Sequence, residues 1–234
     1  MMVEGFHLQV DAPIARLQID RSLRKNAITQ AMWEALPAML KKFETNTDIK
    51  VVILEARSPG IFSAGADITE FRDIAKDEQR RLDNALAIRN AVRALKLFPK
   101  PVIAKIEGDC VGGGCSLILA CDLRFTTAGA RFGITPARLG LVYNLMDTKA
   151  LVDLIGPAQA KYLLFTAQLI EAEEARRIGL VNDILAGDKI NTHVLAVAKQ
   201  MSRVSQHSVR GMKSIIQRIS DGQNDDDAET KALF

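Results

Sequence analysis

Two short apolar segments, each followed by a glycine-bearing turn, constrain the fold of this chain more than any other feature. "VVILEA" at residues 51–56 leads into a loop that contains Gly65, and "PVIAKIEG" at residues 101–108 leads into the three consecutive glycines 112–114. Apolar segments of this length are typical of strands that are buried on both faces of a sheet. Helical patterns follow the turns, so strands alternate with helices and we predict an α/β core.

The remaining patterns predict the outer elements. Alternating apolar and polar residues indicate a β-hairpin around residues 11–13. Thr29 is an N-cap candidate for a helix that Pro37 is expected to kink or to end. Further elements are expected as a charged helix at residues 77–98, two short strands at 122–134, and a long helix at 192–220 followed by an acidic, polar break.

From Asp147 or Thr148 onward the pattern is mostly helical. We divide the chain into a core, residues 1–186, and a C-terminal helical segment, residues 187–234, that is expected to serve in oligomerisation.

Composition excludes several classes of function. The chain has 234 residues and a net charge of +3, with scattered basic residues, which does not favour a nucleic-acid partner. It lacks the run of about 20 apolar residues that a membrane span needs, and its first residues do not resemble a signal peptide. Cys110, Cys115 and Cys121 match no common zinc pattern and suit a reducing compartment. We expect a cytoplasmic protein with no metal and no membrane partner.

The triple-glycine turn presents backbone N–H groups at the start of a helix, where the helix dipole favours negative charge. Neither a P-loop nor a dinucleotide-binding fingerprint fits the spacing, because no Lys-Ser/Thr pair follows and Leu117 stands where the third fingerprint glycine is required. An oxyanion hole and plain close packing of helix on strand both remain open. "GIFSAGADITEF" is a second loop of the same kind, in which Asp67 can cap the following turn.

"FSAGADI" and "KPVIAKIEGDCVGGGCSLILACDL" closely resemble the two oxyanion-hole motifs of the crotonase superfamily, the enoyl-CoA hydratase/isomerase family. The similarity extends from Asn26 to Gly222. It implies a spiral of ββα units, a homotrimer or homohexamer, and a coenzyme A thioester as ligand, with no other cofactor. It also implies that the amides of Ala66 and Gly113 hold the thioester oxygen, leaving no room for a side chain at Gly113.

The resemblance further assigns the coenzyme A contacts. Basic side chains at Arg24 and Lys25 are expected near the phosphates, and the backbone of Ala64, Asp67 and Ile68 is expected near the adenine.

Both glutamates of the family's hydratases are replaced. The first follows the G-G-G-C motif, where this chain has Ser116, and the second falls at Pro136. Losing a general acid or base costs on the order of 10²- to 10⁴-fold in rate. Efficient hydration is therefore not expected.

"TPARLGLVYNLMDT" resembles instead the methylmalonyl-CoA decarboxylase branch of the superfamily. There the residue that matches Tyr143 lies beside the substrate carboxylate. That branch has His where this chain has Ala66, so the substrate can differ. Asn144 stands where some relatives carry a catalytic Asp, and Asp147 is either a replacement base or the N-cap of the next helix.

We predict a lyase of decarboxylase type that stabilises an enolate at Ala66 and Gly113, with Tyr143 orienting or protonating the substrate. A hydratase or Δ3–Δ2 isomerase that uses Asp147 or another base is one alternative. A non-catalytic acyl-CoA-binding protein is an alternative from another class. Family members usually continue beyond a point such as Phe234, with helices that help to close the acyl pocket.

Overall fold

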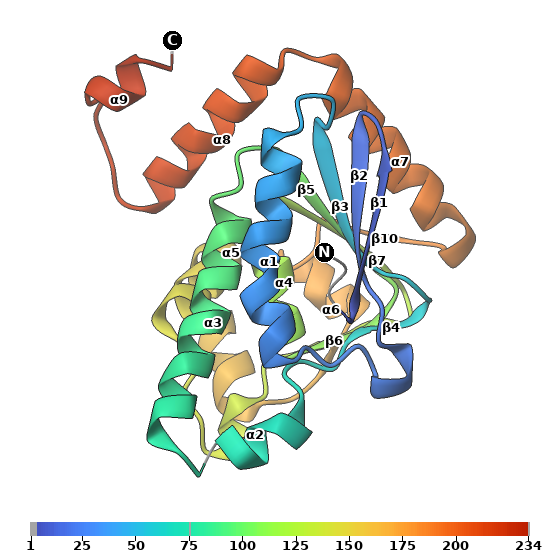
Figure 1. Ribbon diagram of the computed structural model, residues 1–234, viewed down its shortest axis with the longest axis vertical. Coiled ribbons are helices and arrows are strands. Elements are labelled where there is room, and N and C mark those ends of the chain that lie inside the picture. The colour runs from blue at the N-terminus through green and yellow to red at the C-terminus, as the bar shows by residue number, and fades with distance from the viewer. Residues whose placement is uncertain (1–3, 75, 234) are drawn as a thin grey trace.

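The computed structural model describes residues 4–74 and 76–233. Its strands form two sheets (Figure 1). The large sheet has the order β1 (Phe6–Asp11), β2 (Ile14–Ile19), β3 (Val51–Ala56), β5 (Val102–Ile106), β7 (Leu123–Thr127) and β10 (Asp183–Leu185). The small sheet has the order β4 (Gly60–Ser63), β6 (Gly108–Val111), β8 (Arg131–Gly133) and β9 (Ile170–Glu171).

Consecutive strands alternate between the two sheets. β3, β5 and β7 lie in the large sheet, and each is followed at once by β4, β6 or β8 in the small one. Neighbours within these two sets run parallel, whereas β1–β2 and β8–β9 are antiparallel. A helical segment follows each pair of strands, so the predicted spiral of ββα units is confirmed.

The helices lie around these sheets (Figure 1). They are α1 (Gln30–Thr45), α2 (Ile68–Ile74), α3 (Glu78–Lys96), α4 (Gly113–Leu119), α5 (Leu145–Thr166), α6 (Ala172–Arg177), α7 (Gly187–Arg203), α8 (Gln206–Ser220) and α9 (Ala228–Lys231), with two 3-10 turns at Ser22–Arg24 and Pro136–Leu139. Among the described residues, none of these helices combines the length and the apolar character that crossing a bilayer requires.

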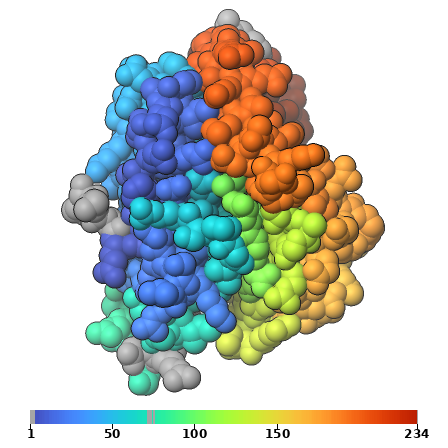
Figure 2. Space-filling view, turned by 90° about the vertical axis from the view of Figure 1, so that its right-hand side faces the viewer, coloured from blue at the N-terminus to red at the C-terminus, as the bar shows by residue number. Residues whose placement is uncertain are grey.

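Burial on both faces explains the apolar sequence of β3. Val52 and Leu54 pack into the main core with α1 and α3, whereas Val51 and Ile53 pack on the opposite face against Ile190, Val194 and Ala198 of α7. Figure 2 shows α7 in orange beside the blue N-terminal hairpin. Helix α7 belongs to the predicted C-terminal segment, yet it forms part of the second core. Helix α8 lies outside that core and buries no side chain completely.

Two expectations about helices need correction. Thr29 caps α1 as predicted, since its Oγ1 accepts a 3.2 Å hydrogen bond from the Met32 amide, but α1 does not end at Pro37. Leu36, Met39 and Leu40 are buried around the proline, and their burial outweighs one lost backbone hydrogen bond.

The long helix expected at residues 192–220 is two helices, because Val204 is extended and Ser205 caps α8. The region after Asp147 is mostly helical as expected, and it also contributes the short strands β9 and β10, which each complete a sheet. Other expectations are confirmed, namely the hairpin and the charged helix α3. Helix α5 is interrupted at Gly156, which has a φ of +78°. The acidic stretch after α8 contains the short helix α9.

Candidate active site

The two glycine-bearing loops meet at one edge of the small sheet. β4 and β6 are parallel neighbours, so the loops that follow them lie side by side. A Cβ atom built on Gly65 would lie 2.9 Å from the Val111 carbonyl oxygen and 3.0 Å from the Gly113 nitrogen. Gly65 also has a φ of +94°, a backbone conformation that residues with a side chain rarely adopt. The close approach of the loops therefore requires glycine at position 65.

The amides of Ala66 and Gly113 lie together and are free. Ile28 donates to the Gly65 carbonyl at 2.8 Å and accepts from Asp67 at 3.0 Å, so the N–H of the intervening Ala66 faces away from Ile28. A Cβ atom on Gly113 would lie 3.4 Å from the Ala66 nitrogen. Within the described residues neither amide donates a backbone hydrogen bond. Two free N–H groups in one place are what an oxyanion hole requires.

Close packing explains Gly114, and a positive φ explains Gly112. A Cβ atom on Gly114 would lie 3.0 Å from Ser63, and Gly112 has a φ of +53°. At Gly113 itself, a Cβ atom would come within 3.0 Å of Cζ2 of the buried Trp33. Close packing and an oxyanion hole are therefore compatible interpretations, because the loops can bring their amides together only while these positions lack side chains.

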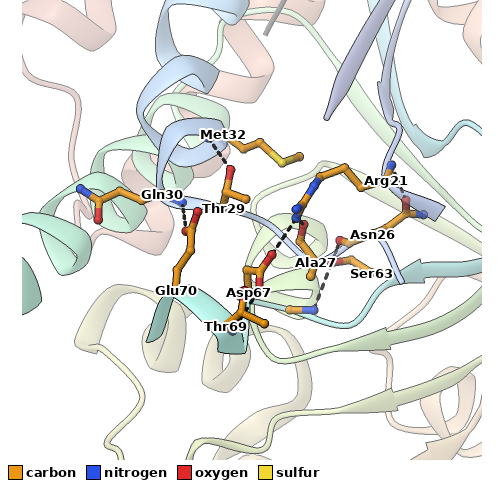
Figure 3. Close-up of polar contacts among 11 residues, drawn as sticks. Arg21, Asn26, Ala27, Thr29, Gln30, Met32, Ser63, Asp67, Thr69 and Glu70 are labelled. Carbon is orange, nitrogen blue, oxygen red and sulfur yellow. Dashed lines mark hydrogen bonds and ion pairs between the residues drawn. The ribbon is translucent and has the colours of Figure 1, made fainter. Parts of the chain in front are cut away.

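Polar contacts hold the first loop in place (Figure 3). Asp67 forms a 3.0 Å ion pair with Arg21, and its Oδ1 accepts from the Thr69 amide at 3.1 Å, which confirms the predicted cap. The Thr69 hydrogen bonds, with help from Arg21, hold the pKa of Asp67 below its ordinary value. Ser63 Oγ donates to the Asn26 carbonyl at 2.8 Å and accepts from the Gly65 amide at 3.1 Å.

A second cluster surrounds Ser116 on α4, three residues after Gly113. Ser116 Oγ lies 2.6 Å from Asp147 Oδ2 and 2.8 Å from the Tyr143 hydroxyl oxygen. Asn144 is the N-cap of α5, since its Oδ1 accepts from the Asp147 amide at 2.9 Å, and its Nδ2 donates to Asp147 Oδ2 at 2.8 Å. The N-cap interpretation of Asp147 is therefore wrong.

The structure thus places a carboxyl group beside Ser116, the position that carries the first glutamate in the family's hydratases. Positions 116 and 136 lack a carboxylate, but Asp147 reaches Ser116 from another helix. Asp147 is 1% exposed, and its Oδ1 has no hydrogen-bond partner in the described part of the chain. Burial raises the pKa of Asp147 against the opposing effects of Ser116, Asn144 and the Lys96 charge. Burial, then the charge of Asp147, also raises the pKa of Tyr143 well above its usual range.

Tyr143 joins this cluster to an apolar groove of about 520 Å³. The groove is lined by Pro136, Ala137, Leu141, Val142, Tyr143, Leu145, Thr148, Leu164 and Phe165. Pro136 contributes only apolar surface here, so nothing at its position replaces the second hydratase glutamate.

Sequence reasoning missed the contact between Ser116 and Asp147. The pattern Asn144-x-x-Asp147, with Asn as cap, is the signal that could have indicated it.

The residues predicted to contact coenzyme A lie in or beside the first glycine-bearing loop. Arg24 and Lys25 are exposed at the 3-10 turn before Asn26, and Ile68 is 60% exposed. The Ala64 and Asp67 amides donate to the carbonyls of Lys25 and Ile28, so a ligand cannot use these two amides without displacing internal bonds. No group of three potential metal ligands occurs among the described residues.

Successive ββα units whose strands alternate between two sheets, together with the paired loop amides, define an enzyme of the crotonase superfamily. The profile of the enoyl-CoA hydratase/isomerase family matches residues 9–232. The chain belongs to this family and is an acyl-CoA-processing enzyme.

Relatives and solved structures agree with that assignment. The chain is 32% identical to the short-chain-enoyl-CoA hydratase of Clostridium acetobutylicum, over 93% of this chain and 83% of the relative. It is 31% identical to the crotonyl-CoA hydratase of Syntrophomonas wolfei, over 92% and 82%. A crystal structure of a putative enoyl-CoA hydratase/isomerase family protein from Hyphomonas neptunium superposes with a TM-score of 0.95 at 37% identity, covering 98% of this chain and 88% of that one.

Proposed function

We propose that this enzyme catalyses a reaction of an acyl-CoA thioester that passes through an enolate, with the amides of Ala66 and Gly113 as its oxyanion hole. The observation that carries the proposal is the pair of free amides from two loops, with a Gly113 Cβ position only 3.4 Å from the Ala66 nitrogen. One such donor typically contributes about 10²- to 10³-fold in rate.

Decarboxylation is the reaction that we put first. When a malonyl-type thioester loses carbon dioxide, the electrons of the broken C–C bond pass into the enolate, so no base is needed to begin. One proton must then reach the α-carbon. The site suits this sequence because it combines the two paired loop amides, a Tyr143 side chain that lines a groove, and one carboxyl group instead of two.

Hydration or Δ3–Δ2 isomerisation is the second candidate. The contact of Asp147 with Ser116 favours it, because it places a carboxyl group where the family's hydratases carry their first glutamate. The relatives from Clostridium and Syntrophomonas are also named as hydratases. Hydration needs both an activated water and a proton donor, however, and Pro136 cannot supply either.

The purified protein should be incubated in parallel with methylmalonyl-CoA, crotonyl-CoA and a 3-enoyl-CoA. We expect propionyl-CoA and carbon dioxide from the first and little conversion of the others. Hydration of crotonyl-CoA alone would contradict the choice of decarboxylation. Measured binding of coenzyme A thioesters without turnover of any of them would support the non-catalytic alternative.

We also propose that Arg24 and Lys25 contact the phosphates and that the enzyme is a trimer or hexamer. Both side chains are exposed, and neither forms an ion pair within the described residues. Met212, Ile216 and Ile219 of α8 are more than half exposed, which favours burial against another copy. Double replacement of Arg24 and Lys25 by Ala should weaken coenzyme A binding in a salt-dependent way, and light scattering should report the assembly.

A further inference from the structure

Three side chains connect a buried carboxyl group to the apolar groove. Tyr143 lines the groove and is partly exposed, whereas Ser116 is 2% and Asp147 is 1% exposed. The oxygen atoms of Tyr143 and Ser116 are 2.8 Å apart, and those of Ser116 and Asp147 are 2.6 Å apart. Both distances lie within the range of O–H···O hydrogen bonds. A ligand in the groove can therefore touch Tyr143, whereas Asp147 is buried and is connected to Tyr143 through Ser116.

We propose that Asp147, Ser116 and Tyr143 form a proton relay, in which the Asp147 carboxyl supplies through the Ser116 hydroxyl the proton that Tyr143 delivers to the α-carbon of the bound thioester. The proposal rests on the enolate chemistry proposed above. Tyr143 is the catalytic residue, and Asp147 and Ser116 act through it.

The protons balance along this chain. The Tyr143 O–H bond breaks as a C–H bond forms at the α-carbon of the enolate, and the tyrosine oxygen takes the proton of Ser116. Ser116 takes the proton of Asp147, which becomes a carboxylate. Its Oδ2 accepts from Ser116 and from Asn144 Nδ2, as it does in the structure. Water that enters the groove after product release returns one proton by the reverse route.

The surroundings of Asp147 suit a group that holds its proton at higher pH than an exposed aspartate does. Burial raises its pKa. The cation whose charge acts on it is Lys96 of α3, which lowers the pKa. Cys110 and Cys115 are buried near Tyr143, and their charges would raise its pKa further. Tyr143 itself does not titrate near neutral pH, because burial keeps it protonated. The pH dependence of the relay therefore belongs to Asp147.

The test is deuterium uptake at the α-carbon of propionyl-CoA in D₂O, followed by mass spectrometry across a range of pH. Wild type should exchange above the buffer rate and speed up as pH rises through the pKa of Asp147, because removal of the α-proton by the reverse route needs the Asp147 carboxylate. Asp147→Asn keeps an oxygen that can accept from Ser116 and Asn144, but its amide can neither take up nor supply the relayed proton. It should lose about 10²- to 10⁴-fold and lose that pH dependence. Asp153→Asn, on the same helix but exposed, is the matched control and should behave as wild type.

Ser116→Ala and Tyr143→Phe provide independent variants. In a serial relay the double variant of Ser116→Ala and Asp147→Asn should be no slower than the slower single variant. Exchange by Asp147→Asn at the wild-type rate and pH profile, or no exchange by wild type above the buffer rate, would overturn the relay. These outcomes are separate from the choice of reaction, because the methylmalonyl-CoA assay alone decides whether decarboxylation is correct.

Discussion

The guanidinium of Arg21 lies 3.0 Å from the carboxylate of Asp67, and this ion pair joins the end of the N-terminal hairpin to the loop that carries Ala66. The same guanidinium donates to the Ala27 carbonyl at 2.5 Å, while Asp67 accepts from Thr69. Contacts from outside the loop thus hold Asp67 in place next to Ala66, whose amide we propose as an oxyanion-hole donor.

Replacing Asp67 by Ala should remove both contacts and leave the Arg21 guanidinium without its partner. We expect a loss of about 1–3 kcal/mol in the free energy of unfolding, measured in urea, and a larger proportional loss of kcat than of thioester affinity. Asp67→Asn, which keeps the cap on Thr69, should be milder. Because the folded pKa of Asp67 lies below its ordinary 3.8, its contribution to stability is present above that value and disappears as pH falls through the lowered pKa. A stable Asp67→Ala variant with unchanged kcat would contradict this role.

Replacing Gly113 by Ala should disrupt the oxyanion hole, because the added methyl group would lie 3.0 Å from Trp33 Cζ2 and 3.4 Å from the Ala66 nitrogen. We expect kcat to fall about 10²- to 10³-fold. Gly129 is the matched control, since a methyl group there meets nothing within 4 Å. Steady-state kinetics of the two variants, with circular dichroism to verify folding, provides the comparison. Equal activity of both would argue against Gly113 as a donor.

Lys100 should make stability rise with pH in the alkaline range. It is completely buried, its Nζ donates to the Phe43 and Asn46 carbonyls at 2.5 and 2.7 Å, and burial lowers its pKa from 10.5 to about 8. Between these two values the unfolded chain keeps the lysine proton that the folded chain has released, so raising the pH favours folding.

The measurement is the difference in thermal unfolding between wild type and Lys100→Met from pH 7 to 10.5. Taking the difference cancels other groups, among them Cys121, whose pKa burial raises to about 12. The gain in wild-type stability with pH should be absent from the variant. Parallel curves for the two proteins would show that Lys100 keeps its proton.

The thiols of Cys110, Cys115 and Cys121 should be unreactive in the folded protein. All three cysteines are free and buried, and burial raises the pKa of Cys110 and Cys121. Since the thiolate is the reactive form, Ellman's reagent should label none of them in native buffer and all of them in guanidinium chloride. Rapid labelling of the native protein would contradict the packing around the triple-glycine turn.

Local patterns predicted the elements whose formation depends on nearby residues. Thr29 was identified as a helix cap and Asp67 as a turn cap because each bonds an amide two or three residues away. The same local rules left open whether Pro37 ends α1, and the helix continues because its burial outweighs one missing hydrogen bond. They also joined α7 to α8, although Ser205 is a cap residue that could have indicated the start of the second helix.

The sequence by itself determined the α/β core and the two glycine-bearing loops, because glycine is required where backbones approach closely and apolar strands must be buried on both faces. Only the tertiary structure decided which side chains share the site. Asp147 reaches Ser116 across 31 residues because α5 packs beside α4, and no local rule of spacing relates two positions on different helices. The sequence shows that positions 116 and 136 carry no glutamate, whereas only the packing of the helices shows that the Asp147 carboxyl group lies beside Ser116.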